Sequence, residues 1–162
     1  ISITLTQFKN YSHQQFSFDR NVIAITGLNG IGKTNLLDAI HYLCFTKSYF
    51  TPADGSNVQQ GKPGFRIEGQ LELNSQPVNL TVILRENGKK EVSCNGTAYE
   101  KFSQHVGHYP CVMIAPDDSE LIIGGSELRR RFLDTLLSQI NPGYLQHLIE
   151  YNKIIQQRNS YL

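Results

Sequence analysis

The stretch "GLNGIGKT", residues 27–34, decides the fold expected for this chain. Gly27 and Gly32 enclose four residues and are followed by Lys33 and Thr34, which is the pattern of a phosphate-binding loop. Glycine reaches backbone torsions that other residues avoid, so successive N–H groups can point toward one anion. Lys33 is then expected to neutralise phosphate charge, and the Thr34 hydroxyl to ligate Mg²⁺.

The sequence on both sides of the loop fits this interpretation. The run "NVIAI", residues 21–25, is apolar and β-branched and predicts a buried strand that ends at Thr26. Apolar residues at helical spacing follow the loop: Leu36, Leu37, Ile40, Leu43 and Cys44. A strand, a glycine loop and a helix in this order predict a nucleotide-binding α/β fold of the P-loop NTPase class. An ordinary glycine-rich turn would lack these neighbours.

Composition limits the class of protein but not its ligand. The chain has 162 residues, 40% hydrophobic and 18% charged, with a net charge of +1, so one core-forming domain or slightly more is expected. A nearly neutral chain can still carry a basic groove, so nucleic-acid binding is neither favoured nor excluded. The three cysteines show no CxxC spacing, and no apolar run reaches membrane length. These features predict a cytoplasmic location.

Alternating apolar residues predict strands before and after the loop. Segments 1–5 and 16–18 indicate two strands ahead of it. Segments 65–73, 78–84 and 89–94 indicate further strands, separated by the turns "NSQP", "ENG" and "NGT". The middle of the chain is therefore expected to be an antiparallel β-meander. A nucleotide kinase or a Ras-type GTPase would continue with βαβ units instead.

Two helices are expected at the end of the chain. Ser126 is the predicted N-cap of the first, and Asn141 ends that helix and caps a second one that runs to the last residue. The apolar stripe of the second helix has nothing in this chain to pack against, so the chain is expected to be a piece of a longer protein. The expected domains are residues 1–125, part of an ATPase head, and residues 126–162, the beginning of a helical lobe.

A carboxylate that could hold the metal for hydrolysis is hard to find. The run "CVMIAPDD", residues 111–118, resembles a metal strand, but Pro116 ends a strand before Asp117 is reached. Asp38 and Asp54 have no strand context. A self-contained small P-loop kinase or NTPase, the alternative function, would need such a carboxylate within these residues.

Four segments in unbroken order resemble the RecF family, bacterial recombination and gap-repair ATPases. They are "LTQFKNY" (5–11), "GLNGIGKTNLLDAIHYL" (27–43), "APDDSELIIGGSELRRRFLD" (115–134) and "QRNSYL" (157–162). The resemblance implies the N-terminal part of an ABC-type ATPase head related to SMC proteins. Another SMC-like head would share the loop but not the segment 116–134.

The family implies ATP and Mg²⁺ as cofactors and a slow, DNA-stimulated ATPase in the full-length protein. Two heads are expected to close on ATP as a homodimer and to clamp duplex DNA near gaps or junctions between single and double strands. A RecR-type mediator is the expected protein partner, and DNA replication, DNA repair and the SOS response are the expected processes. The signature loop and the metal strand are expected beyond Leu162, so residues 1–162 alone are expected to be inactive.

The resemblance also assigns residues. Eight of them are expected to bind phosphates: Gly27, Leu28, Asn29, Gly30, Ile31, Gly32, Lys33 and Thr34. Thr34 is also the expected metal ligand, and Asn35 is expected at the α-phosphate. Lys9 and Asn10 are expected near the base or the phosphates, although Lys9 stands where arginine is usual in the family.

Two assignments stay open. Arg129, Arg130 and Arg131 fit an exposed helix face with an ion pair to Glu127 or Asp134, and they also fit a contact with DNA or a second head. ABC-type heads use a glutamine after the meander to reach Mg²⁺, but no glutamine stands beside residues 111–118. That role is left without a residue.

Overall fold

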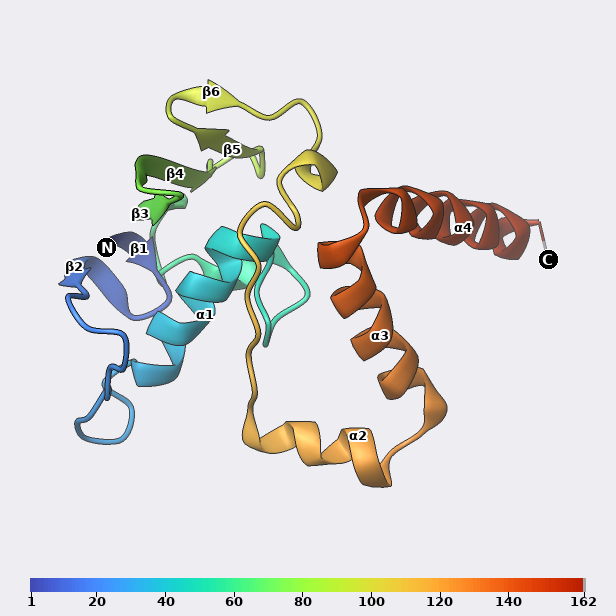
Figure 1. The fold of residues 1–162 in the computed structure, drawn as a ribbon, viewed down its shortest axis with the longest axis horizontal. Coiled ribbons are helices and arrows are strands. Elements are labelled where there is room, and N and C mark those ends of the chain that lie inside the picture. The colour runs from blue at the N-terminus through green and yellow to red at the C-terminus, as the bar shows by residue number, and fades with distance from the viewer. Residues whose placement is uncertain (162) are drawn as a thin grey trace. The chain divides into compact units, whose positions relative to one another are not determined.

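The computed structural model describes residues 1–161, which form two compact units (Figure 1). The first unit comprises Ile1–Phe102 and the second begins at Ser103. The first holds the phosphate-loop pattern, and the second holds the helices expected at the end of the chain. Each unit is described by itself.

The first unit is built on an antiparallel sheet of six strands in the order β2-β1-β3-β4-β5-β6. The strands are β1 (Ser2–Phe8), β2 (Tyr11–Ser17), β3 (Phe65–Leu73), β4 (Gln76–Leu84), β5 (Lys90–Cys94) and β6 (Thr97–Ala98). The hairpin predicted ahead of the loop and the meander predicted after it are both confirmed.

The turn between β3 and β4 is shorter than predicted. Asn74 and Ser75 both have positive φ, 51° and 59°, so two residues are enough to reverse the chain. The strand β4 therefore begins at Gln76 and includes Pro77. Proline is tolerated there because β5 pairs only with residues 80–84 of β4, so no ladder bond is lost on that side.

The helix α1 (Lys33–Phe45) packs on one face of this sheet and forms the core with it (Figure 1). Three buried rings meet edge to face, with centroids 5.2 to 6.1 Å apart: Phe8, Tyr42 and Phe65. Gly69 of β3 lets the helix approach closely, because a Cβ there would lie 2.7 Å from Cδ1 of Leu43. The sheet thus fixes the helix whose N-terminus carries the loop.

The strand predicted at residues 21–26 is not formed. Val22 is 88% exposed and Ile23 44%, and the segment belongs to no strand. An apolar, β-branched run forms a strand only when a neighbour pairs with its N–H and C=O groups. The six described strands pair among themselves in the order given above, and this run is not among their partners.

The described residues of the second unit form three α-helices: α2 (Glu120–Ile123), α3 (Ser126–Ile140) and α4 (Pro142–Ser160). Ser126 is the first helical residue and Gly125 takes the N-cap position, so the predicted cap was one residue late. Asn141 caps α4 as predicted, since its Oδ1 accepts from the N–H groups of Gly143 and Tyr144. The helix α4 ends at Ser160 rather than at the last residue, and Leu162 lies outside the described residues.

Apolar side chains stay uncovered in the second unit. The run 111–115 forms no strand, and Val112 and Ile114 are largely exposed. Pro116 instead begins a short 3₁₀ helix that extends to Ser119. The stripe predicted on α3 is present, but half of the surface of Phe132 remains accessible.

None of the helices in residues 1–161 has both the length and the apolar character needed to cross a membrane.

Candidate functional site

The phosphate-loop pattern leads directly into the N-terminus of α1, as predicted. Gly32 is the N-cap residue with φ 112°, and no side chain caps the helix. The first turn contains no acidic residue. The first N–H of the helix that has a hydrogen-bond acceptor is that of Leu36, which donates to the Gly32 carbonyl oxygen at 3.0 Å. Within residues 1–161 the structure shows no acceptor for the N–H groups of residues 32–35. This helix end is therefore partially positive and has donors to offer.

Lys33 lies within the loop. Its Nζ donates to the carbonyl oxygens of Gly27 and Leu28, both at 2.9 Å. The ammonium group is thus held over the backbone of the loop by the loop itself. Thr34 follows in the first helical turn and is exposed, so its hydroxyl is accessible to a ligand.

The turn between β1 and β2 contacts the loop through side chains. The Asn10 Nδ2 donates to the carbonyl oxygen of Ile31 at 2.9 Å, and its Oδ1 accepts from Nδ2 of Asn35 at 2.8 Å. The Tyr11 hydroxyl donates to the carbonyl oxygen of Gly32 at 3.0 Å. The structure therefore brings together Asn10, Asn35 and the loop, which lie apart in the sequence. Tyr11 was not assigned a role from the sequence.

Lys9 is placed differently from its neighbour Asn10. Its Nζ lies 2.5 Å from Oδ2 of Asp38, whose side chain is fully buried in α1. Asp38 also accepts from the Ser48 hydroxyl and from the Tyr49 N–H, both at 2.7 Å. Lys9 thus fixes the β1–β2 turn to α1, and its ammonium is engaged by a carboxylate rather than by the loop.

A second ion pair joins β5 to Asp54, which begins a short 3₁₀ helix after α1 (Asp54–Asn57). Lys90 Nζ lies 2.8 Å from Oδ2 of Asp54, which also accepts a hydrogen bond from the Tyr42 hydroxyl. Burial raises the pKa of Tyr42, and the bond to Asp54 raises it further, so the phenol remains a neutral donor. Neither this cluster nor Asp38 was recognised from the sequence. For Asp38 the available signal was its place among the apolar residues of the inner face of α1.

Three carboxylates of the second unit, Asp118, Asp134 and Glu127, also have local partners. Asp118 Oδ2 accepts from the Ala115 N–H at 2.6 Å, and Asp134 accepts from the Tyr144 hydroxyl. Glu127 pairs with Arg131 at 2.7 Å. In residues 1–161 no group of three or more histidine, cysteine or acidic side chains is placed to hold a metal ion.

The three arginines of α3 make contacts within their own unit. Arg129 donates to the carbonyl oxygens of Leu121 and Gly124, and Arg130 donates to the Ser126 hydroxyl. With the pair between Arg131 and Glu127, these contacts agree with the helix-face interpretation. A contact with DNA or with a second head stays a prediction.

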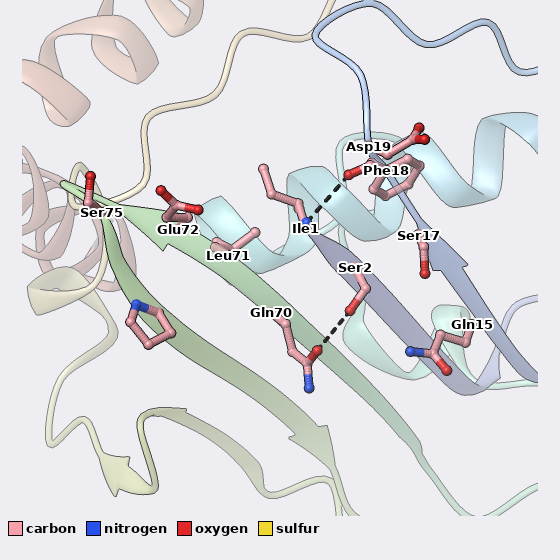
Figure 2. A pocket seen from close by; sticks show the side chains of 11 residues that line it. Ile1, Ser2, Gln15, Ser17, Phe18, Asp19, Gln70, Leu71, Glu72 and Ser75 are labelled. Atoms are coloured by element: carbon pink, nitrogen blue, oxygen red, sulfur yellow. Dashed lines mark hydrogen bonds between the residues drawn. The ribbon is translucent and has the colours of Figure 1, made fainter.

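A cavity of about 540 Å³ lies elsewhere on the first unit, at the ends of β1 to β4 (Figure 2). Figure 2 shows that the Ser2 hydroxyl donates a hydrogen bond to Gln70 in the lining of this cavity, with Gln15 beside them. None of the residues predicted for the site lines this cavity. The loop at the N-terminus of α1 remains the candidate site.

Comparison with known proteins agrees with the pattern of the loop. Residues 2–161 match the family described as "AAA domain". A DNA replication and repair protein RecF from Flavobacterium johnsoniae is 44% identical over 160 residues, which are 99% of this chain and 45% of that protein. RecF from Geobacillus thermodenitrificans is 40% identical over 161 residues, which are 99% of this chain and 43% of that protein. The chain thus spans less than half the length of the curated relatives it matches.

Solved structures match the fold as well. A structure described as the recombination mediator protein RecF with ATP, in the RecFOR pathway, aligns with a TM-score of 0.92 and 30% identity. It covers 99% of this chain, and the chain covers 43% of it. An SMC ATPase aligns with a TM-score of 0.62 at 19% identity, which shows a common fold alone. The P-loop ATPase-head fold predicted from the sequence is confirmed by these matches. The chain belongs to the AAA domain family, and its predicted resemblance to the RecF proteins is confirmed over nearly its whole length.

Proposed function

We propose that this chain carries the phosphate-binding part of the ATP site of a RecF-like DNA replication and repair protein. The observation that carries the proposal is the N-terminus of α1, where the N–H groups of residues 32–35 have no acceptor within residues 1–161. Gly32 provides no capping side chain, and the first turn has no acidic residue that would repel an anion. The relatives and the solved RecF structure with ATP support the same assignment.

The residues present fit a nucleotide triphosphate with its metal. Backbone N–H groups of residues 27–34 would hold the phosphates, and Lys33 would neutralise their charge. Thr34 would offer its hydroxyl to Mg²⁺, and Asn35 would lie at the α-phosphate. Bound ATP would supply the γ-phosphate whose presence or loss switches the state of the protein. Asn10 would border the phosphates, and Lys9 would hold the turn that carries Asn10 through its ion pair with Asp38.

The wider function is proposed from the relatives. The chain would serve DNA replication and repair in the cytoplasm, within a protein that closes as a dimer on ATP and clamps duplex DNA near gaps. A RecR-type mediator would be its partner, because the solved relative is described as part of the RecFOR pathway. Residues 1–125 would belong to the ATPase head, and residues 126–162 would begin the helical lobe.

Nucleotide-dependent DNA binding tests this proposal. The protein at its full encoded length is titrated with gapped and intact duplexes, with ATP or ADP, at several salt concentrations. Binding by phosphate contacts should require ATP, vary little with sequence, and fall steeply as salt rises. The variant Lys33→Ala serves as the control and should lose both ATP binding and DNA binding, since the loop loses its cation.

Wild-type affinity for ATP in Lys33→Ala would contradict the assignment of the loop. ATP binding without any nucleotide-dependent binding to DNA would leave the loop assigned and would reject the DNA clamp.

A further inference from the structure

Asn10 and Tyr11 reach the loop from outside and contact its carbonyl groups. The peptide unit between Ile31 and Gly32 has its oxygen on Asn10 Nδ2. The oxygen of the next unit accepts from the Tyr11 hydroxyl and also from the Leu36 N–H, each at 3.0 Å. Residues 1–161 contain no cis peptide bonds, so the N–H of each unit points away from its own C=O. Contacts on these two oxygens therefore direct the N–H groups of Gly32 and Lys33 toward the opposite side of the loop.

These two residues are themselves held in place. The strands β1 and β2 pair up to Phe8 and Tyr11, so the turn consists of Lys9 and Asn10 alone. Lys9 is anchored to Asp38, and its N–H donates to the Asn57 carbonyl at 2.7 Å. The Asn10 amide is oriented by Asn35, which donates to its oxygen and leaves its nitrogen for Ile31. The contact thus comes from a supported turn.

Gly32 fits closely against this pair. A Cβ on Gly32 would lie 2.6 Å from Nδ2 of Asn10 and 2.8 Å from the Tyr11 oxygen. The two side chains therefore occupy the place that any other residue at position 32 would need. The contacts of Asn10 and Tyr11 with the loop therefore require glycine at position 32.

We propose that Asn10 and Tyr11 are positioning residues, which set the direction of the phosphate-binding N–H groups of Gly32 and Lys33. They act through the loop backbone and have no contact with the base. This inference rests on the proposed nucleotide site. It predicts that removing either side chain weakens the binding of every ligand whose phosphates occupy the loop, and by the same factor for each such ligand.

Displacement of a fluorescent ATP analogue from the full-length protein measures this effect. Wild type and the variants Asn10→Ala and Tyr11→Phe are compared with ATP and with pyrophosphate as competitors. We expect Asn10→Ala to weaken both competitors about fivefold and Tyr11→Phe about threefold, as the loss of an exposed and of a half-buried hydrogen bond would produce. Equal factors for ATP and pyrophosphate are the expected mark of positioning.

Two controls separate positioning from stability. Gln59 supports the same hairpin, because its Nε2 donates to the Ser12 hydroxyl at 3.0 Å and to the Asn10 carbonyl oxygen at 3.5 Å, but its side chain makes no hydrogen bond to the loop. Gln59→Ala should leave both affinities within about twofold of wild type, as expected for exposed polar contacts outside the site. Asn152→Ala, the same substitution on an exposed position of α4, should change neither affinity.

A double-mutant cycle adds a measurement of coupling. Asn10→Ala and Asn35→Ala remove the two ends of one hydrogen bond, so their effects on affinity should not add. The effects of Asn10→Ala and Asn152→Ala on affinity should add, because the two residues lie in different units.

The outcomes differ clearly. A loss of ATP affinity with unchanged pyrophosphate affinity would overturn the proposal and give Asn10 a contact with the base or ribose. Unchanged affinities, or an equal loss in Gln59→Ala, would also overturn it. If wild type binds no nucleotide, or if Lys33→Ala binds normally, the proposed function itself fails.

Discussion

At the scale of single residues, the loop depends on glycines whose backbone conformation other residues rarely adopt. Gly32 and Gly30 both have positive φ, 112° and 83°. Their surroundings differ, because a Cβ on Gly30 would meet nothing within 4 Å, whereas one on Gly32 would overlap Asn10 and Tyr11. The two glycines therefore offer a matched comparison of backbone strain with and without steric overlap.

We predict that Gly32→Ala destabilises the fold more than Gly30→Ala. The variant at position 30 should lose about 1 kcal/mol of unfolding free energy from left-handed strain alone. The variant at position 32 should lose about 1 to 2 kcal/mol more, because its methyl group must displace two side chains. Urea unfolding without nucleotide measures the difference. Equal losses would mean that the β1–β2 turn yields to the methyl group at little cost.

The sequence predicted the place of this loop at the start of a helix correctly, but not the hydrogen bonds that hold it. The pattern of glycines, Lys33 and Thr34 is local, so its position at the start of a helix could be predicted from spacing alone. The contacts of Asn10 and Tyr11 with the loop span 21 residues and depend on how β1 packs beside α1. The burial of Asp38 could not be predicted either, because its partner Lys9 lies on another element.

At the scale of elements, α1 joins the loop to the sheet. Its inner face combines Leu36, Ala39 and Leu43 with buried polar groups that find partners on other segments. Among these is His41, whose Nδ1 lies 3.1 Å from the carbonyl oxygen of Lys47. A carbonyl only accepts, so the neutral ring carries its proton on Nδ1. The ring also stacks on Phe45 with centroids 4.4 Å apart.

The buried imidazole should make stability depend on pH. Burial lowers the pKa of His41, and this outweighs the bond to Lys47 and the charge of Asp38, which act in the opposite direction. In the unfolded chain the ring binds a proton near its ordinary pKa of about 6.5, whereas the folded ring binds it only at lower pH. Stability should therefore fall as pH drops below that value.

The variant His41→Phe isolates this effect, because phenylalanine keeps the stack and does not titrate. The unfolding free energy of wild type minus that of the variant should decrease between pH 7.5 and 5.5, with a slope of at most about 1.4 kcal/mol per pH unit. Urea unfolding at both pH values measures it. A difference independent of pH would show that the folded ring protonates as easily as the unfolded one.

Elements were predicted well where the pattern was local and poorly where pairing decides. The hairpin of β1 and β2 and the meander from β3 to β6 followed from alternation and from Asn-Gly turns. The run 21–26 has the same composition as a strand, but no described strand pairs with it. Apolar composition indicates that a segment tends to be buried. It does not indicate which other segment will pair with it or cover it.

At the scale of the whole molecule, the acidic side chains decide what this chain can do alone. Hydrolysis of ATP requires a carboxylate that holds the metal and positions water. Asp38 and Asp54 are engaged by Lys9 and Lys90, and Asp118 accepts from the Ala115 N–H. Asp117 is exposed and follows Pro116 in a 3₁₀ helix, where no strand directs it toward the loop.

We predict that the 162-residue chain by itself shows no ATP hydrolysis that depends on Lys33. The loop supplies binding, but the charges and dipoles that stabilise the transition state act as a unit, and their joint loss removes several orders of magnitude in rate. Phosphate release by the wild-type chain and by Lys33→Ala, measured in parallel with and without DNA, should be equal and at background. Lys33 alone cannot prepare a γ-phosphate for attack when no carboxylate holds the metal and positions water. Turnover in the wild type that disappears in Lys33→Ala would show that a carboxylate of this chain serves the metal. Asp117→Asn and Asp118→Asn would then identify it, and the alternative of a self-contained small enzyme would gain the support that it now lacks.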